Sequence, residues 1–489
     1  MAYDFKTEPY RHQREALNVC KAWLAPEFFW RMDMGTGKTK VAIDNAGALF
    51  ERGKIRGLFV VAPNTVCRNW AGVEIPAHLP DRIARQVLVW RPKADQRAQW
   101  RDDWAALKQP CDYRTSDAPR LAVFVMNHEA LATVQGVAYA QTFLLSHPCL
   151  FVFDESTAIK NPQAKRTKAA LKLAKLAPYR RAMSGLPVVK NPLDLWSQCE
   201  FLQHGILGDT SFYSFRARYC QLAPVWGVKG AVEILGYRDL GKLRDVLNSF
   251  SFAVTKEECL DLPPKVYTKR YVPLTDEQAR IYKQMAADFE VFIGSGEATA
   301  PNVLVRLLRM QQILCGYLPL DDGKIEEIPS LRLHTLIEAF RDTDAKAIVW
   351  APFRRDVERI ASKLATEFRT KVAQLHGDVS ADGRAANIHE FQNNPDVRFI
   401  VGTPQTGGVG VTLTAATVVV YYANTWDLGI RAQSEDRAHR IGQKSAVTYI
   451  DLVAPDTIDE TILDALRAKR SLAEAVTGSA REAGRRGWL

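Results

Sequence analysis

Two clusters in the first third of the chain have the chemistry needed to bind and cleave a phosphate ester. The first contains Gly35, Gly37, Lys38 and Thr39 within five residues. Glycines two apart let the backbone turn tightly and direct its N–H groups at a phosphate, and the following lysine can reach the outer phosphates. A threonine hydroxyl in this position can ligate Mg²⁺. This run therefore predicts a phosphate-binding loop.

The second cluster is the pair of carboxylates Asp154 and Glu155, which follows the apolar residues 149–153. Asp154 would hold Mg²⁺, and Glu155 would polarise the attacking water. An Asp-Glu pair is also common where a helix begins, as cap and first-turn charge. A phosphate-binding loop upstream favours the catalytic interpretation.

These residues need rigid elements on either side of them. Residues 28–30 are apolar, as in a buried strand, and residues 40–46 fit a helix whose N-terminus faces the phosphate. Because strands and helices alternate along both halves of the chain, we expect parallel sheets and an α/β fold. The strict loop pattern has glycine where this chain has Met32, so an empty Gly-rich turn is the alternative.

Arginines near the end of the second half could complete the same chemistry. Arg437 and Arg440 are three residues apart, and we expect them on one face of a helix. A pair so placed can neutralise charge on a phosphoryl group during transfer. A solvated basic helix end is the alternative for this stretch taken alone.

Composition limits the class of protein. The chain has 489 residues, enough for two or three domains, and with 47% hydrophobic and 25% charged residues it is globular. A net charge of +10 favours a polyanionic partner such as nucleic acid. Eight cysteines without a C-x-x-C pattern argue against zinc modules and disulfide frameworks. Without a signal peptide or a long apolar run, we expect no membrane partner and a cytoplasmic location in a prokaryote or a virus-infected host, or a nuclear one in a eukaryote.

The motifs resemble those of the SNF2 family of superfamily 2 helicase-like ATPases. That family also lacks the first glycine of the loop, which accounts for Met32. Where many relatives have Ala-His, this chain has Ser156 and Thr157, which leaves the roles of the two carboxylates intact. The resemblance runs from about Tyr10 to about Leu472. Its segments are residues 10–13 (motif Q), 33–39 (I), 60–70 (Ia), 125–131 (Ib), 154–161 (II), 184–196 (III) and 403–443 (V and VI).

This resemblance implies two RecA-like parallel-sheet lobes with SNF2-type helical insertions, and ATP with Mg²⁺ between the lobes. Residues 195–335 are predicted to be mostly helical, with an N-cap at Thr275 and a hinge at the paired prolines of residues 261–265. The expected domains are lobe 1 (1–200), protrusion 1 (201–262), hinge and protrusion 2 (263–335), lobe 2 with a brace helix (336–475) and a flexible basic tail (476–489).

The resemblance also assigns roles to single residues. The catalytic residues are Lys38, Asp154, Glu155, Arg437 and Arg440, with Thr39 and Asp154 on the metal. ATP would be bound by Gln13, Met34, Gly35, Thr36, Gly37, Lys38, Thr39, Gly408 and Gly410. Nucleic acid would be contacted by Pro63, Asn64, Arg68, Trp70, Asn127, Phe353, Thr403 and Thr406. Ser184, Gly185 and Gln433 would couple the two events.

Taken together, these features predict a monomeric ATPase motor that translocates on double-stranded DNA without stable strand separation. A strand-separating DNA helicase or an RNA helicase is the alternative among enzymes. An ATP-switched DNA-binding adaptor is the alternative of another class, although it need not keep the lysine, both carboxylates and both arginines. A metabolic kinase ranks third, because it needs no second lobe bearing arginines. The sequence does not indicate protein partners or a pathway.

Overall fold

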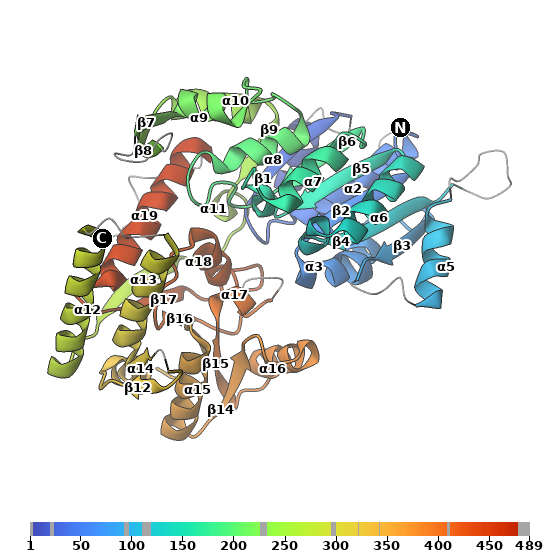
Figure 1. Cartoon of the computed structure of the whole chain (residues 1–489). Coiled ribbons are helices and arrows are strands. Elements are labelled where there is room, and N and C mark those ends of the chain that lie inside the picture. Colours follow the sequence, from blue (N-terminus) through green and yellow to red (C-terminus); the bar gives the residue numbers. More distant parts are fainter. Residues whose placement is uncertain are drawn as a thin grey trace. The chain divides into compact units, whose positions relative to one another are not determined.

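The chain forms two compact units, each built on one parallel sheet (Figure 1). The computed structural model describes residues 3–19, 24–91, 97–109, 119–224, 232–294, 300–320, 322–341, 343–407 and 411–477. Unit 1 contains the chain up to Asp261 and the last turns of helix α19 from Lys469, and unit 2 contains Leu262–Ala468. The predicted α/β class with two parallel-sheet lobes is confirmed.

The sheet of unit 1 has seven parallel strands in the order β3-β4-β2-β5-β6-β1-β9. All six residues of β2 and of β5 are buried. Alternate residues enter two separate cores, with Phe59 and Phe124 on one face and Val60 and Val123 on the other. Both faces are therefore covered, which is why these strands have continuous apolar sequences. The strands are β1 (Glu27–Met32), β2 (Gly57–Ala62), β3 (Arg85–Val89), β4 (Leu121–Asn127), β5 (Cys149–Asp154), β6 (Tyr179–Met183) and β9 (Ser251–Val254).

Helices connect these strands, and a small antiparallel hairpin lies between α9 and α10 in the chain. Because the strands are parallel, the segments that follow β1, β2, β4, β5 and β6 all begin at one edge of the sheet. The helices are α1 (Arg11–Val19), α2 (Lys38–Glu51), α3 (Asn64–Asn69), α4 (Ile75–His78), α5 (Ala98–Leu107), α6 (Val134–Ser146), α7 (Lys165–Ala174), α8 (Asp194–Leu202), α9 (Phe212–Tyr219), α10 (Leu240–Ser249) and α11 (Lys256–Cys259); the hairpin is β7 (Cys220–Pro224) with β8 (Val232–Tyr237).

Unit 2 has a six-stranded parallel sheet in the order β10-β17-β16-β13-β15-β14. Its strands are β10 (Lys265–Tyr271), β13 (Ala347–Trp350), β14 (Lys371–Leu375), β15 (Val397–Gly402), β16 (Val418–Tyr421) and β17 (Val447–Val453), beside a hairpin of β11 (Tyr317–Pro319) and β12 (Ile325–Glu327). Its helices are α12 (Asp276–Gly294), α13 (Ala300–Cys315), α14 (Arg332–Arg341), α15 (Arg354–Phe368), α16 (Ala381–Asn393), α17 (Pro404–Gly407), α18 (Leu428–Glu435) and α19 (Ile458–Thr477).

The prediction that residues 195–335 are mostly helical is wrong for six short strands, β7 to β12. Helix α10 ends at Ser249, and β9 then pairs with β1 in the sheet of unit 1. The paired prolines lie outside the described helices and strands, and β10 begins directly after them, at Lys265. Pro264 has no N–H to donate, but its carbonyl still accepts from the N–H of Val447 at 3.2 Å.

Predictions at helix starts are partly confirmed. The N–H of Gln278 donates to Oγ1 of Thr275 at 3.2 Å, as expected for the N-cap of α12. The side-chain amide of Gln278 donates instead to the carbonyl of Ile313 at 2.8 Å, so the reciprocal bond of a capping box is replaced by a packing contact with α13. Helix α1 begins at Arg11, within the segment 10–13 that resembles motif Q. Among the described helices, none is both long and apolar enough to cross a membrane.

Candidate active site

The predicted phosphate-binding loop connects β1 to α2. Gly35 and Gly37 have φ angles of 83° and 84°, in the left-handed region that favours glycine. No side chain caps the N-terminus of α2, so its first N–H groups are available to an anion. Lys38 is mostly buried, with Nζ 3.3 Å from the carbonyl of Asp33. The backbone donors and the lysine together fit a polyphosphate.

Gln13 and His12 hold this loop from α1. Nε2 of Gln13 donates to the carbonyl of Thr36 at 3.0 Å, and Nε2 of His12 donates to the same carbonyl at 2.7 Å. A Cβ at Gly37 would lie 2.2 Å from Nε2 of Gln13, so this contact requires glycine. Gln13 is buried, and its Oε1 accepts from the N–H of Tyr10. Its amide therefore positions the loop, and the binding of ATP by Gln13 stays a prediction.

Asp154 is the last residue of β5, and Glu155 follows it with a φ of 51°. Burial and, after it, the adjacent charge of Glu155 raise the pKa of Asp154 to about 6, while the Trp70 indole and Lys38 oppose the shift. A buried carboxylate next to a half-buried one that repels it suits a bound cation. Oxygen donors from Asp154 and Thr39 match the preference of Mg²⁺, which takes one or two carboxylates and completes its shell with phosphate and water.

The segment after β6 contacts both parts of this site. Oγ of Ser184 donates to Oε2 of Glu155 at 3.4 Å. A Cβ added at Gly185 would lie 3.0 Å from the backbone nitrogen of Met34 and 3.2 Å from Cα of Asp33, so a larger residue would push against the backbone of the loop. The structure thus brings these two predicted coupling residues together with the loop and the carboxylate. Their coupling role stays a prediction.

The predicted nucleic-acid contacts of unit 1 divide into exposed and buried residues. Asn64 and Arg68 are exposed on α3, and Pro63 is half-buried at its start. Asn127 is mostly buried, and its Nδ2 donates to Glu129 at 2.8 Å. Trp70 is fully buried, so the prediction that its side chain contacts nucleic acid is wrong. Its indole N–H donates to Oδ2 of Asp154 instead, at 2.9 Å.

The predicted arginine pair lies in unit 2, but it is not on a helix face. Helix α18 ends at Glu435, and Arg437 and Arg440 occupy the turns that follow. This segment leaves the helix because it bonds to a neighbouring loop: the carbonyl of Arg437 accepts from the N–H of Leu413 at 2.9 Å. Nη1 of Arg437 donates to the carbonyl of Val411, and Nη1 of Arg440 donates to Oγ1 of Thr412.

The remaining predicted residues of unit 2 are more dispersed. Phe353 precedes α15 and packs half-buried against a core. The hydroxyls of Thr403 and Thr406 bond to each other at 2.8 Å. Gln433 lies half-buried on α18. Gly408 and Gly410, predicted to bind ATP, lie outside the described residues.

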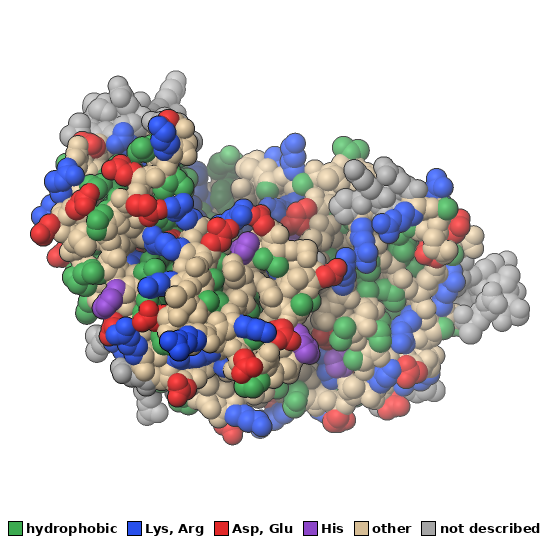
Figure 2. Space-filling view, turned by 90° about the horizontal axis from the view of Figure 1, so that it is seen from below, with side chains coloured by type: hydrophobic (Ala, Val, Ile, Leu, Met, Phe, Trp, Pro, Cys, Tyr) green, Lys and Arg blue, Asp and Glu red, His purple; other side chains and the backbone are tan. Residues whose placement is uncertain are grey.

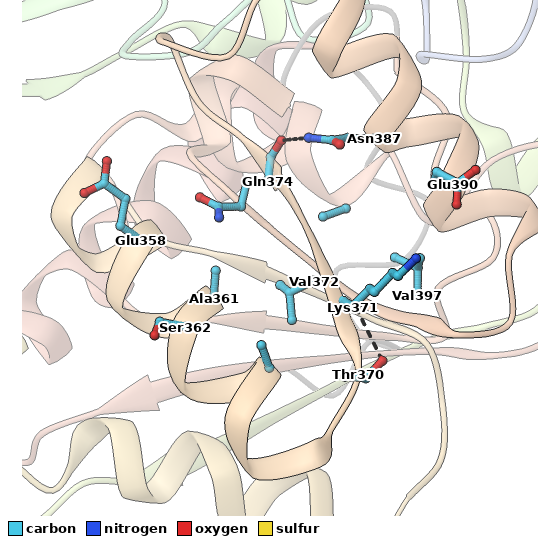
Figure 3. A pocket seen from close by; sticks show the side chains of 12 residues that line it. Glu358, Ala361, Ser362, Thr370, Lys371, Val372, Gln374, Asn387, Glu390 and Val397 are labelled. Atoms are coloured by element: carbon cyan, nitrogen blue, oxygen red, sulfur yellow. Dashed lines mark hydrogen bonds between the residues drawn. The ribbon is translucent and has the colours of Figure 1, made fainter.

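A surface hollow of about 650 Å³ lies between α15, β14 and α16 (Figure 3). Glu358, Lys371 and Glu390 line it, and Asn387 donates to the carbonyl of Gln374 at one side. No residue predicted from the sequence lines this hollow, so it is separate from the candidate active site.

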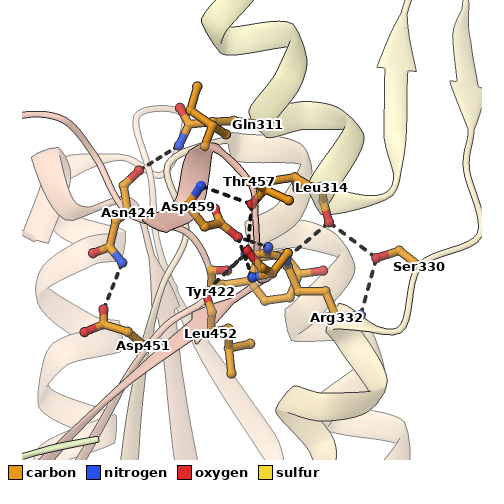
Figure 4. A network of polar contacts seen from close by, with 12 residues as sticks. Gln311, Leu314, Ser330, Arg332, Tyr422, Asn424, Asp451, Leu452, Thr457 and Asp459 are labelled. Atoms are coloured by element: carbon orange, nitrogen blue, oxygen red, sulfur yellow. Dashed lines mark hydrogen bonds and ion pairs between the residues drawn. The ribbon is translucent and has the colours of Figure 1, made fainter. Parts of the chain in front are cut away.

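Two buried arginines of unit 2 were missed by sequence reasoning. Arg431 of α18 pairs with Glu435 at 2.8 Å and with Asp451 at 2.5 Å. Arg332 lies at the centre of a polar network and pairs with Asp459 (Figure 4). The i,i+4 spacing of Arg431 and Glu435 was a weak available signal. Nothing in the local sequence marks Arg332.

Comparison with known proteins identifies the family. A model of the SNF2-related domain matches residues 31–316, more than half of the chain. This chain belongs to the SNF2-related family. A model of the helicase conserved C-terminal domain matches residues 330–442, so the predicted relationship to SNF2 helicase-like ATPases is confirmed for both halves. Membership implies the use of ATP.

Individual SNF2 relatives are distant and longer than this chain. YwqA of Bacillus subtilis, described as a candidate ATP-dependent helicase/translocase, is 28% identical over 91% of this chain and 46% of its own. Human ZRANB3, a DNA annealing helicase and endonuclease, is 26% identical over 91% of this chain and 38% of its own. The chain thus spans less than half the length of these relatives. The Sulfolobus solfataricus SWI2/SNF2 ATPase core in complex with dsDNA is 25% identical over 98% of this chain and 95% of that chain, with a TM-score of 0.43.

His128, beside the SNF2 carboxylate motif, should make unit 1 sensitive to acid. Burial lowers its pKa from 6.5 to about 4, and its Nε2 donates to the carbonyl of Asp154. The unfolded chain therefore binds more protons between pH 6.5 and 4, and the free energy of unfolding falls as pH drops through this window, by about 3 kcal/mol at most. In urea titrations from pH 7 to 4.5, His128→Gln should reduce the slope of the free energy of unfolding against pH. His204→Gln, at an exposed ring, should keep it; equal slopes in both variants would contradict the assignment.

Proposed function

We propose that this chain is an ATP-hydrolysing motor that translocates on double-stranded DNA without stable strand separation. The observation that carries the proposal is the contact of three motifs at one sheet edge in unit 1. The Ser184-Gly185 turn contacts both the carboxylate Glu155 and the phosphate loop there. Membership of the SNF2-related family supports the same interpretation. An intact loop lysine and both carboxylates are what hydrolysis requires.

The residues would divide the work as follows. The loop N–H groups and Lys38 bind the phosphates, and Glu155 orients the attacking water and accepts its proton. Thr39 and Asp154 would hold Mg²⁺, which neutralises phosphate charge when bound. Arg437 and Arg440, from the other unit, would stabilise the charge that develops on the transferred phosphoryl group. Ser184 and Gly185 would pass the change at Glu155 and the loop to the rest of unit 1.

Several features support duplex DNA as the track. The exposed side chains Asn64 and Arg68 follow a strand of unit 1, and Thr403 and Thr406 follow a strand of unit 2. The net charge is +10, but Figure 2 shows Lys and Arg side chains interspersed with Asp and Glu over the face in view. We therefore expect dispersed contacts with the DNA backbone, tolerant of base sequence and weakened by salt.

The proposal is tested by ATPase rates with no nucleic acid, with duplex DNA, with single-stranded DNA and with RNA, each at low and moderate salt. We expect strong stimulation by duplex DNA that declines as salt rises. Stimulation by single strands or RNA alone would favour the strand-separating helicase. No hydrolysis under any condition would favour the ATP-switched adaptor. A forked-duplex assay, in which we expect no strand release, tests the absence of unwinding.

A further inference from the structure

Trp70 lies in the helical segment that follows β2, between the exposed Arg68 and the core. Its side chain is fully buried, and its Nε1–H donates to Oδ2 of Asp154 at 2.9 Å. An indole N–H is a donor only, and it is uncharged. It can therefore fix the orientation of a carboxylate without neutralising the charge that a cation needs.

The backbone has an irregularity that places Trp70 there. The buried positions of this segment are Cys67, Trp70, Ile75 and Leu79, spaced by three, five and four residues. A regular α-helix keeps one face buried only with spacings of three or four. Residues Trp70–Glu74 form a π turn, which takes up the extra residue and keeps Trp70 and Ile75 on the same face. π turns are rare and frequently occur at functional sites.

We propose that Trp70 is a positioning residue that orients Asp154 for Mg²⁺ and acts on hydrolysis through that carboxylate. The proposal rests on the assignment of Asp154 as a metal-holding residue under the proposed function. Because Oδ2 is held by the indole, the carboxylate cannot rotate freely beside the charged Glu155. Mutation of a residue that hydrogen-bonds a metal ligand in this way typically lowers metal affinity or activity by about 10- to 100-fold.

The test removes the indole N–H and keeps an aromatic ring at the position. Trp70→Phe is compared with Trp100→Phe, a buried tryptophan of the same unit whose Nε1–H donates to the carbonyl of Val89 at 3.2 Å. Calorimetry measures the affinity of each variant for ADP with and without Mg²⁺, and ATPase assays measure the Mg²⁺ concentration at half-maximal rate. If Trp70→Phe fails to fold, 3-benzothienylalanine at position 70 replaces the N–H by sulfur in a ring of the same shape.

We expect Trp70→Phe to weaken the binding of Mg²⁺-ADP and to raise the half-maximal Mg²⁺ concentration, each about tenfold. Binding of ADP without Mg²⁺ should not change, and Trp100→Phe should match the wild type in every measurement. If Trp70 has a merely structural role, Trp70→Phe should weaken the binding of ADP equally with and without Mg²⁺. That result would overturn the proposal, as would an unchanged Mg²⁺ dependence. If the wild type hydrolyses no ATP, the proposed function fails, while calorimetry still decides the role of Trp70.

Discussion

Glu155→Gln should abolish ATP hydrolysis and leave the binding of nucleotide and duplex DNA largely intact. The amide has nearly the same shape as the carboxylate, so the contact with Ser184 survives. It cannot accept a proton from water, and losing a general base lowers rates by about 10²- to 10⁴-fold. Lys38→Ala should abolish hydrolysis as well, because the phosphates lose the lysine that binds their outer oxygens. Single-turnover ATPase assays beside filter binding of labelled duplex measure both properties.

A matched control is Glu51→Gln. Glu51 lies at the end of α2 opposite the phosphate loop and pairs with Arg82 at 2.7 Å near the surface. This variant removes the same charge from the same unit and should hydrolyse ATP at the wild-type rate. Wild-type turnover in Glu155→Gln or Lys38→Ala would show that the active site is assigned to the wrong residues.

The parts of the site that sequence could predict depend on local patterns. Parallel strands covered on both faces have continuous apolar sequences, so β5 and the carboxylates at its end are visible in the residue order. The loop between β1 and α2 is equally local, because its glycines and lysine lie within one turn of chain. Short strands such as β9 lack this signal, since four residues cannot establish a period of two against one of 3.6.

Two errors in the site have a different origin, because each depends on contacts distant in sequence. Trp70 follows exposed polar residues, a pattern that predicts a contact with nucleic acid, but a π turn directs its side chain at Asp154, 84 residues away. Arg437 and Arg440 fit a helical spacing, but the bond between Leu413 and Arg437 ends the helix first. No local propensity encodes either contact, so the sequence pattern indicates the motifs but not the directions of these side chains.

Buried charges are the hardest feature to predict from local sequence. Arginine is almost never fully buried unless it is paired, and its partner can be distant in sequence. Arg332 is fully buried in unit 2. Its Nε donates to the carbonyl of Leu314 at 3.1 Å, and its Nη1 donates to the carbonyl of Tyr422 at 2.6 Å. The charge of Asp459, 127 residues away, raises the pKa of Arg332 against the opposing effect of burial, so the guanidinium stays charged. This network joins α14 to α13, to the ends of the central strands and to α19 (Figure 4).

Arg332→Met should therefore destabilise unit 2 by about 3–5 kcal/mol, since it leaves Asp459 buried without its cation. Thermal and urea unfolding measure the loss. Arg341→Met is the matched control, because Arg341 is on the same helix and pairs with Glu338 at 2.7 Å on the surface, where solvent screens the charges. It should unfold close to the wild type. Adding Asp459→Leu to Arg332→Met should recover part of the stability, because an apolar pair removes the unpaired charge. Equal losses from Arg332→Met and Arg341→Met would mean that the buried pair contributes no more than a surface pair, contrary to the geometry.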